Sequence, residues 1–296
     1  MTQFIELLIS GISLGFVYAL IALGFVIIFK AGRVINFAHG SLLLLGAYVI
    51  ARLHGSLGFG LAVLVGVVAT ALVGVLVQVL ILRRARGASA QTLTIVTIGV
   101  DILLATELTR RIGTKVLSIG DPWRDQVVHV GSVSIPEARI AAAIVAILIL
   151  AGFLAAFRFS GWGIALRASS EDGETAALMG IRLGRVATGA WALAGALAAV
   201  GGVFFTTFPT PGVDANVGLT ALSAFPAAIL GGLDSVVGAV VGGLVIGVVV
   251  TMTAGYQDDL SFLGRGLSDV APYVVMLLVL LVRPSGLFGT RELTRV

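Results

Sequence analysis

The sequence predicts an all-α, polytopic membrane helix bundle, and two observations carry this prediction. Of the 296 residues 58% are hydrophobic and only 11% are charged, with a mean hydropathy of +1.10, whereas an ordinary soluble domain has roughly 25% charged residues. The apolar runs are continuous over lengths close to the ~20 residues that a helix needs to cross a bilayer, and they lack the alternation of barrel strands. We expect a single transmembrane bundle over 1–296 with about eight to nine transmembrane segments, some of them broken or re-entrant.

Charge-free intervals locate the expected spans, because a charged side chain is costly in hydrocarbon. Two of the intervals are short, and these are candidates for re-entrant segments. The first interval is expected to be a retained span and not a signal peptide, because its apolar run is long and no Lys or Arg precedes Lys30. The intervals are 5–29, 34–52, 57–82, 92–109, 140–157, 186–208, 218–231, 236–256 and 269–282.

The distribution of Lys and Arg predicts the orientation, because short cytoplasmic loops carry an excess of these residues. If the N-terminus lies outside, the inside loops hold most of the 19 Lys and Arg residues, including the arginines of 158–185. We therefore expect a multi-pass protein of the cytoplasmic (inner) membrane, with the N-terminus outside and the C-terminus in the cytoplasm.

The composition excludes several classes of function. The chain has no Cys and three scattered His, so neither a disulfide framework nor a metal site is expected. Neither lysine follows a glycine, so a phosphate-binding GxxxxGK[ST] loop is absent, and the sequence contains no HExxH motif. We expect no enzyme activity, cofactor or metal in this chain. The pI near 10.0 is attributed to topological arginines and not to nucleic-acid binding.

One compact polar passage interrupts the apolar chain at 161–186, GWGIALRASSEDGETAALMGIRLGRV. Ser169 or Ser170 can cap a helix, acidic residues follow in the first turn, and Gly180 can adopt a left-handed conformation at the end. These signals predict a short helix over 171–179. Its small and flexible apolar side chains suit a groove on another protein, and a solvated connecting loop is an equally good interpretation of the charges.

The same passage resembles a known motif. Its segment ETAALMG at 174–180 is similar to the EAA loop of ABC-importer permeases, with Thr175 in place of the first alanine, and the longer run GIALRASSEDGETAALMGIRLGRV resembles the cytoplasmic loop of the branched-chain amino acid transporter permeases. Because similar runs follow in order over nearly the whole chain, it is identified as a member of that family. The further runs are GISLGFVYALIALGFVIIF at 11–29, RVINFAHG at 33–40, AFPAAILGGLDSVVGAVVGG at 224–243 and RPSGLFG at 283–289.

The resemblance implies a permease subunit of an ATP-binding-cassette importer. It would carry branched-chain amino acids, or a related small polar solute such as another amino acid, urea, an amide or a carboxylate, into the cell. In such systems two permeases form the pore, two ATPase subunits bind ATP and dock on the cytoplasmic face, and an external substrate-binding protein delivers the solute. The second permease is expected to be a related paralogue. The family's coupling helix corresponds here to Glu174, Thr175, Ala176, Ala177, Leu178, Met179 and Gly180.

A second polar cluster opens the second expected span, where Asn36, His39 and Ser41 lie close together beside Gly40. Such a start makes a poor continuous helix and a good broken one, whose unwound backbone can meet a polar solute. Asn36, His39 and Ser41 are therefore candidate residues of the translocation path. Packing through hydrogen bonds to neighbouring helices is an equally good interpretation.

A comparable interruption occurs in the second half, where Phe225-Pro226 is followed by Gly231-Gly232. Proline and paired glycines in a short span favour a discontinuous element, and interruptions in both halves fit a pseudo-symmetric transporter. Phe225 and Pro226 therefore join the candidate path. Close helix contact explains glycines such as Gly238 nearly as well.

Asp101 lies near the middle of the expected span 92–109, where an unpaired carboxylate costs at least ~2.5 kcal/mol. It is expected to face the bundle or a water-filled path, or to pair with a nearby donor. In the family that this chain resembles, a small hydroxyl residue is more usual at this position. Glu107 is expected to form an interfacial ion pair with Arg110 and Arg111.

The loop 110–139, expected outside, has the size and mixed polarity to receive a binding protein, although an ordinary surface loop has the same character. The loop 158–185, expected in the cytoplasm, carries the coupling helix. The alternative class of function is a stand-alone gradient-driven secondary transporter or channel, in which Asp101 and His39 form a proton relay.

Overall fold

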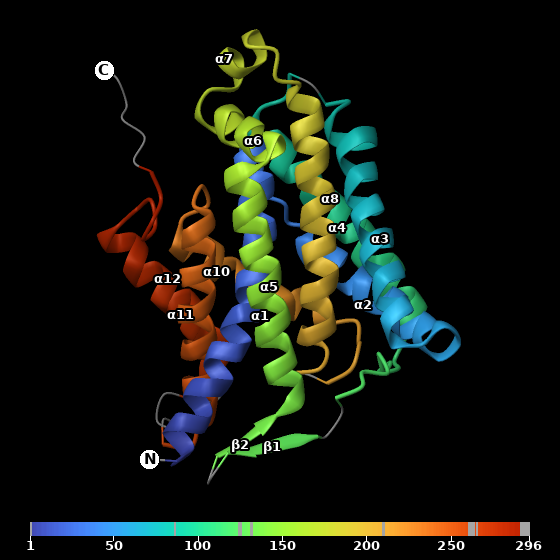
Figure 1. The fold of residues 1–296 in the computed structure, drawn as a ribbon, viewed down its shortest axis with the longest axis vertical. Helices are drawn as coiled ribbons and strands as arrows, with labels where there is room; N and C mark the ends of the chain where they lie inside the picture. Colours follow the sequence, from blue (N-terminus) through green and yellow to red (C-terminus); the bar gives the residue numbers. More distant parts are fainter. Residues whose placement is uncertain are drawn as a thin grey trace.

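The computed structural model describes residues 2–85, 87–123, 126–130, 133–208, 211–259, 264 and 266–290, and these form a helical membrane bundle (Figure 1). Within these residues, 7 helices are long and apolar enough to cross a membrane. They are α1 (Thr2–Gly32), α2 (His39–Leu57), α3 (Phe59–Leu76) with a π-helical continuation (Val77–Leu82), α4 (Ala90–Ile112), α5 (Glu137–Phe159), α8 (Leu183–Phe205) and α11 (Val236–Gly255).

The remaining elements are short. They are α6 (Gly161–Glu171), α7 (Gly173–Leu178), α9 (Val217–Ala221), a 3-10 turn (Leu222–Ala224), α10 (Phe225–Gly231), α12 (Leu267–Val282), β1 (Val127–Val130) and β2 (Val133–Pro136). β1 and β2 form an antiparallel hairpin in which Val127 pairs with Pro136, in a stretch where the sequence predicted only loop.

α1 is the most buried of the spans and packs along α11 through residues without large side chains. A Cβ on Gly247 would lie 2.3 Å from the Gly15 Cα, and a Cβ on Gly243 would lie 2.6 Å from the Ala19 Cα. Lipid gives apolar helices no solvent-driven reason to associate, so close backbone packing through small residues stabilises such pairs. The glycines of 236–247 are therefore residues of close helix–helix contact.

Each of the nine predicted intervals corresponds to a helical stretch in the same order, and seven of these stretches are long enough to cross a membrane, whereas 217–231 and 267–282 are shorter. The second span begins at His39 and not at 34, because α1 ends at Gly32, Arg33 has a φ of 55°, and the following residues are not helical. The expected discontinuous element at 218–231 is present as α9, a 3-10 turn and α10.

The two ends of the bundle are differently built (Figure 1). α6 and α7 lie together at one end, and the hairpin and the start of α1 lie at the other. The polar passage at 161–186 is therefore separated from the loop 110–139 by the full length of the spans.

Candidate functional site

α7 is a short helix whose start is fixed by one carboxylate. The Oδ1 of Asp172 accepts hydrogen bonds from the backbone N–H groups of Glu174 at 3.0 Å and Thr175 at 3.1 Å. The Thr175 hydroxyl donates to the other carboxylate oxygen at 2.5 Å. These bonds, led by the one from the Thr175 hydroxyl, favour the charged form and hold the pKa of Asp172 below its ordinary value.

The structure has two helices where the sequence predicted one over 171–179. Asp172 has an extended backbone with a φ of −148°, and this single residue ends α6 and starts α7. Ser169 and Ser170 lie inside α6, where their hydroxyls donate to carbonyls three residues earlier. The prediction that one of these serines caps the helix is therefore wrong.

The end of α7 is a glycine turn, as predicted. Gly180 has a φ of 87°, its N–H donates to the Ala177 carbonyl at 3.0 Å, and the Ile181 N–H donates to the Ala176 carbonyl at 3.0 Å. This pair of bonds is the Schellman arrangement, which places a residue with positive φ just after the helix. Glycine adopts that conformation without strain.

Two large apolar side chains at the end of α7 face away from the bundle. Leu178 is 88% exposed and Met179 is 80% exposed, whereas Ala176 is buried beneath the helix. An apolar pair held out on a capped turn is suited to a groove on another protein. The other predicted coupling residues are also exposed, and they are Glu174, Thr175, Ala177 and Gly180.

α6 ties this turn to the membrane helices. Arg167 donates hydrogen bonds to the backbone carbonyls of Phe157 and of Arg158 at the end of α5, the latter at 3.1 Å. At the end of α1, Nη2 of Arg33 donates to the Ser170 carbonyl at 3.0 Å. These hydrogen bonds join α6 to the ends of α5 and α1.

The chain enters α2 through a non-helical segment, 34–38. The Thr97 hydroxyl on α4 accepts a hydrogen bond from the Phe37 N–H at 3.1 Å and donates to the Ile35 carbonyl at 3.0 Å. The backbone groups that the break frees thus find partners in the protein, as they must at membrane depth.

Asn36 and His39 are completely buried at this break. The Asn36 side-chain oxygen accepts from the Ala38 N–H at 3.1 Å. Within the described residues, Nδ2 of Asn36 and both ring nitrogens of His39 make no hydrogen bond of normal geometry. The His39 ring occupies the space beside Gly24, where a Cβ would lie 2.3 Å from its Cε1 atom. Both side chains are packed inside the protein in this conformation.

The two interrupted segments contact each other in the middle of the bundle. A Cβ on Gly40 would lie 2.4 Å from the carbonyl oxygen of Gly218, so α2 and α9 touch through their backbones. The Phe225 ring at the start of α10 packs against Phe25, with 5.2 Å between the ring centroids. Pro226 is buried in the first turn of α10, where a missing N–H breaks no helical hydrogen bond.

Ser41 and Asp101 meet at a second place beside the break. The Ser41 hydroxyl donates to Oδ1 of Asp101 at 2.5 Å. Both residues line a cavity of about 200 Å³ between α2, α4 and the residues around α9. The structure thus brings these two predicted path residues to one cavity, while Asn36, His39 and Pro226 are buried.

The C-terminal run 283–289 has a structural role that sequence reasoning missed. The Leu287 N–H donates to the Leu230 carbonyl at 2.8 Å, so this run folds back onto the turn between α10 and α11. Lys30 at the end of α1 donates to the Asp234 carbonyl of the same turn at 2.9 Å. The sequence signal was Gly232 in one run and Gly286 and Gly289 in the other, because backbones this close leave no room for a Cβ.

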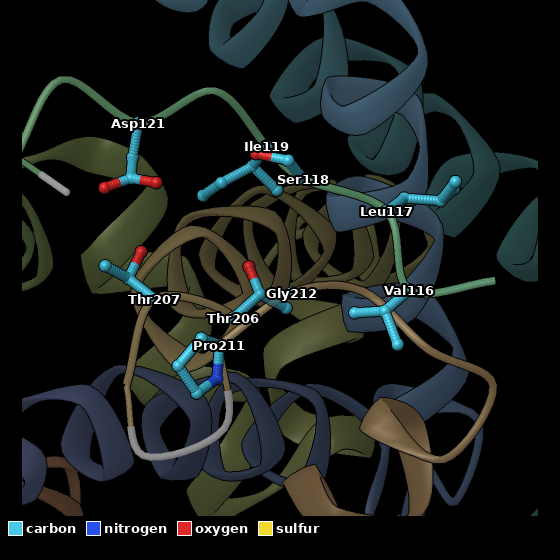
Figure 2. A pocket seen from close by; sticks show the side chains of 9 residues that line it. All are labelled: Val116, Leu117, Ser118, Ile119, Asp121, Thr206, Thr207, Pro211 and Gly212. Atoms are coloured by element: carbon cyan, nitrogen blue, oxygen red, sulfur yellow. The ribbon is translucent and has the colours of Figure 1, made fainter.

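At the opposite end, two loops enclose a pocket of about 390 Å³ (Figure 2). Leu117 and Val213 pair their backbones, with N···O distances of 2.9 and 2.8 Å. Asp121 from one loop and Thr207 from the other lie on facing sides of the pocket (Figure 2). Part of the loop 110–139 is therefore a packed wall and not a free connection; its residues Arg124 and Asp125 lie outside the described part of the chain.

The end of α4 carries the predicted ion pair. Glu107 binds Arg110 at 2.9 Å and Arg111 at 2.6 Å. Among the residues that the structure describes, no group of three or more His, Cys, Asp or Glu side chains could hold a metal ion.

A bundle of apolar helices with two interrupted segments meeting at its centre, and a capped helix exposed at one end, defines a polytopic membrane transport protein. Comparison with known proteins supports this class of protein. The family model described as the permease component of the branched-chain amino acid transport system matches residues 7–280, so the chain belongs to this family of LivH-like ABC permeases. No solved structure matches the chain.

Curated relatives match over almost their whole length. The chain is 31% identical to the high-affinity branched-chain amino acid transport system permease protein LivH of Escherichia coli and 30% identical to LivH of Salmonella typhimurium. It is 28% identical to the permease protein BraD of Pseudomonas aeruginosa. Each alignment covers 99% of this chain and 98% of the relative. The chain is thus a transport permease and not a catalytic enzyme.

Proposed function

We propose that this chain is a permease subunit of an ATP-driven importer, and that it carries branched-chain amino acids or a related small polar solute into the cell. The names of the relatives support the class of solute. The observation that supports the ATP-driven mechanism is α7, which holds Leu178 and Met179 outside the bundle on a turn that is capped at both ends.

The proposal assigns the partners by position. The full chain, 1–296, is one permease domain that pairs with a second, related permease, and ATP is bound by two ATPase subunits that receive α7. The loop 158–185 then faces the cytoplasm, which places the N-terminus outside and the C-terminus inside. In this orientation the pocket lined by Asp121 and Thr207 lies at the outer end of the bundle, where we expect the external substrate-binding protein to dock (Figure 2).

The mechanism follows the contacts of α6. Closure of the ATPases pushes on α7, and the Arg33 and Arg167 hydrogen bonds pass the displacement to α1 and α5. Because α1 packs against α10 and its Phe25 ring contacts Phe225, a shift of α1 changes the interrupted segments at the centre of the bundle. The ATPases thereby switch the path between outward-facing and inward-facing states.

The test is uptake of L-leucine by the complete transporter reconstituted in vesicles, with ATP hydrolysis measured in parallel. Gly180→Pro removes the N–H that closes the α7 turn, and proline cannot adopt the φ of 87° that this position requires. The variant is expected to lower the amount of solute carried per ATP at least about tenfold. Glu174→Arg on the same exposed face is expected to act in the same direction.

Gly184→Ala is the matched control, because an added Cβ there meets nothing within 4 Å. The competing class of function, a gradient-driven carrier or channel, makes the opposite prediction. Uptake by this chain alone, driven by an ion gradient and indifferent to ATP, would overturn the proposal.

A further inference from the structure

We infer that the cavity between α2, α4 and α9 is a binding subsite for an ammonium group, with the Asp101 carboxylate as its charged partner. The inference rests on the proposed function, and it adds which group of an amino acid the permease itself recognises. Ser41 is assigned as a positioning residue that orients the carboxylate.

The position of Asp101 is the first argument. Asp101 is the middle residue of α4, which spans Ala90–Ile112, so its carboxylate lies near half depth in the membrane. It is only partly buried and lines the cavity. Polar solutes are bound near the midplane where helices are interrupted, and the α9 interruption forms the other wall of this cavity.

The charge is the second argument. Among the described residues, no Lys or Arg forms an ion pair with Asp101, whereas Glu107, farther along the same helix, binds Arg110 and Arg111. The hydrogen-bond partner of the Asp101 carboxylate in that part of the chain is the neutral Ser41 hydroxyl. A carboxylate at this depth without a cation is costly, so a cationic group in the cavity is favoured.

The remaining walls fit the rest of an aliphatic amino acid. Leu44, Leu219 and Leu222 supply apolar surface, and Thr109 and Asn216 supply neutral hydrogen-bonding groups. The volume of about 200 Å³ is that of roughly seven water molecules in the liquid. The cavity therefore suits a small zwitterion with an apolar side chain.

The absence of native cysteine makes the charge of this cavity directly measurable. Ala105 lines the cavity one turn from Asp101, so Ala105→Cys places the only thiol of this chain in it, and labelling is measured on this chain after its separation from the other subunits. The complete transporter carrying this change is labelled in membrane vesicles with two methanethiosulfonates of similar size, one bearing a trimethylammonium group and one a sulfonate.

The cationic reagent is expected to react faster than the anionic one, and the ratio of the two labelling rates is the cationic advantage. Asp101→Asn should lower this advantage about tenfold, because one charge within a few ångströms acts on the reagent. Glu107→Gln, which removes a carboxylate of α4 that does not line the cavity, should leave the advantage unchanged. L-leucine should slow labelling, and 4-methylpentanoate, which lacks the amino group, should not.

Uptake supplies the second readout. Asp101→Asn keeps the size of the side chain and is expected to lower L-leucine uptake at least about tenfold, and Asp101→Glu should restore part of it. Equal labelling by the two reagents, or an advantage unaffected by Asp101→Asn, would overturn the ammonium subsite. If the cationic advantage and leucine protection are present but uptake does not depend on ATP, the subsite stands and the proposed function fails.

Discussion

α7 and the central break at 34–38 both depart from continuous membrane helices, and they are stabilised in opposite ways. The bonds that shape α7 all lie between Asp172 and Ile181, and its large apolar side chains point away from the protein. The break is held by residues far apart in sequence, such as Phe37 with Thr97, and His39 within it is fully buried. α7 is therefore held by its own residues and exposes its apolar side chains, whereas the break is held by tertiary contacts.

This difference separates two kinds of mutant. Changes at the break should lower the stability of the protein. Changes on the surface of α7 should leave stability nearly unchanged and alter only the coupling to a partner.

The largest loss of stability is expected for Gly40→Val. A Cβ at Gly40 would lie 2.4 Å from the Gly218 carbonyl oxygen, so the backbones of α2 and α9 must separate. Overpacking of this kind costs about 3 kcal/mol. The measurement is the melting temperature of the purified protein in detergent.

Gly55→Val in the same helix is the control, because an added Cβ there meets nothing within 4 Å. Equal melting temperatures for the two variants would mean that the two interrupted segments do not rely on this contact.

A smaller loss is expected for Thr97→Val. The substitution keeps the shape of the side chain and removes the acceptor of the Phe37 N–H, which leaves a partly buried donor unpaired at a cost of about 1 kcal/mol. Thr97→Ser retains the hydroxyl and should restore most of the stability. If Thr97→Val and Thr97→Ser melt at the same temperature, the hydroxyl does not hold the break.

Asp172→Ala is expected to have a local effect only. It removes the acceptor of the Glu174 and Thr175 N–H groups, so these amides should exchange hydrogen about fivefold faster. Hydrogen exchange measured by mass spectrometry on the peptide covering 161–185 provides the test. Asp172→Asn keeps an oxygen acceptor and is the control; unchanged exchange in Asp172→Ala would show that α7 needs no cap.

The smallest effect is that of pH on the same cap. The pKa of Asp172 is lower in the folded protein than its ordinary value of about 3.9, so its stabilising contribution is complete above that value. The contribution is lost as the pH falls through the lowered folded pKa. Exchange of the Glu174 and Thr175 amides, corrected for the intrinsic rate, should be constant from pH 5 to 8 and rise only below about 4. A rise near pH 6 would contradict the assignment.

Much of the fold was predictable from the sequence, because a membrane span is visible as an apolar run, and each such segment must satisfy its own backbone hydrogen bonds, which makes it a helix. The turn at Gly180 was predictable because it too depends on a local signal, a glycine at the end of a helix. Asp172 was overlooked as the cap because Ser169 and Ser170 are equally good candidates by residue type, and only the backbone of α6 distinguishes them.

The long-range features were not predictable. The contact of Gly40 with Gly218 and the return of Leu287 onto Leu230 join segments far apart in sequence, and the sequence marks each only by glycines. The candidate path residues were chosen one at a time by polarity. That Ser41 and Asp101 share a cavity while His39 is enclosed depends on how the interrupted helices pack.

The central claim is that α7 couples a partner ATPase to transport, and the most direct measurement is the amount of L-leucine carried per ATP hydrolysed by the reconstituted transporter with Leu178→Asp. Leu178 is 88% exposed, so the melting temperature of the chain should stay within about 1 °C of the unmodified protein. The account predicts at least about a tenfold drop in leucine carried per ATP, and near-normal transport for Leu178→Met. Normal transport by Leu178→Asp, with ATP hydrolysis still coupled to uptake, would contradict it.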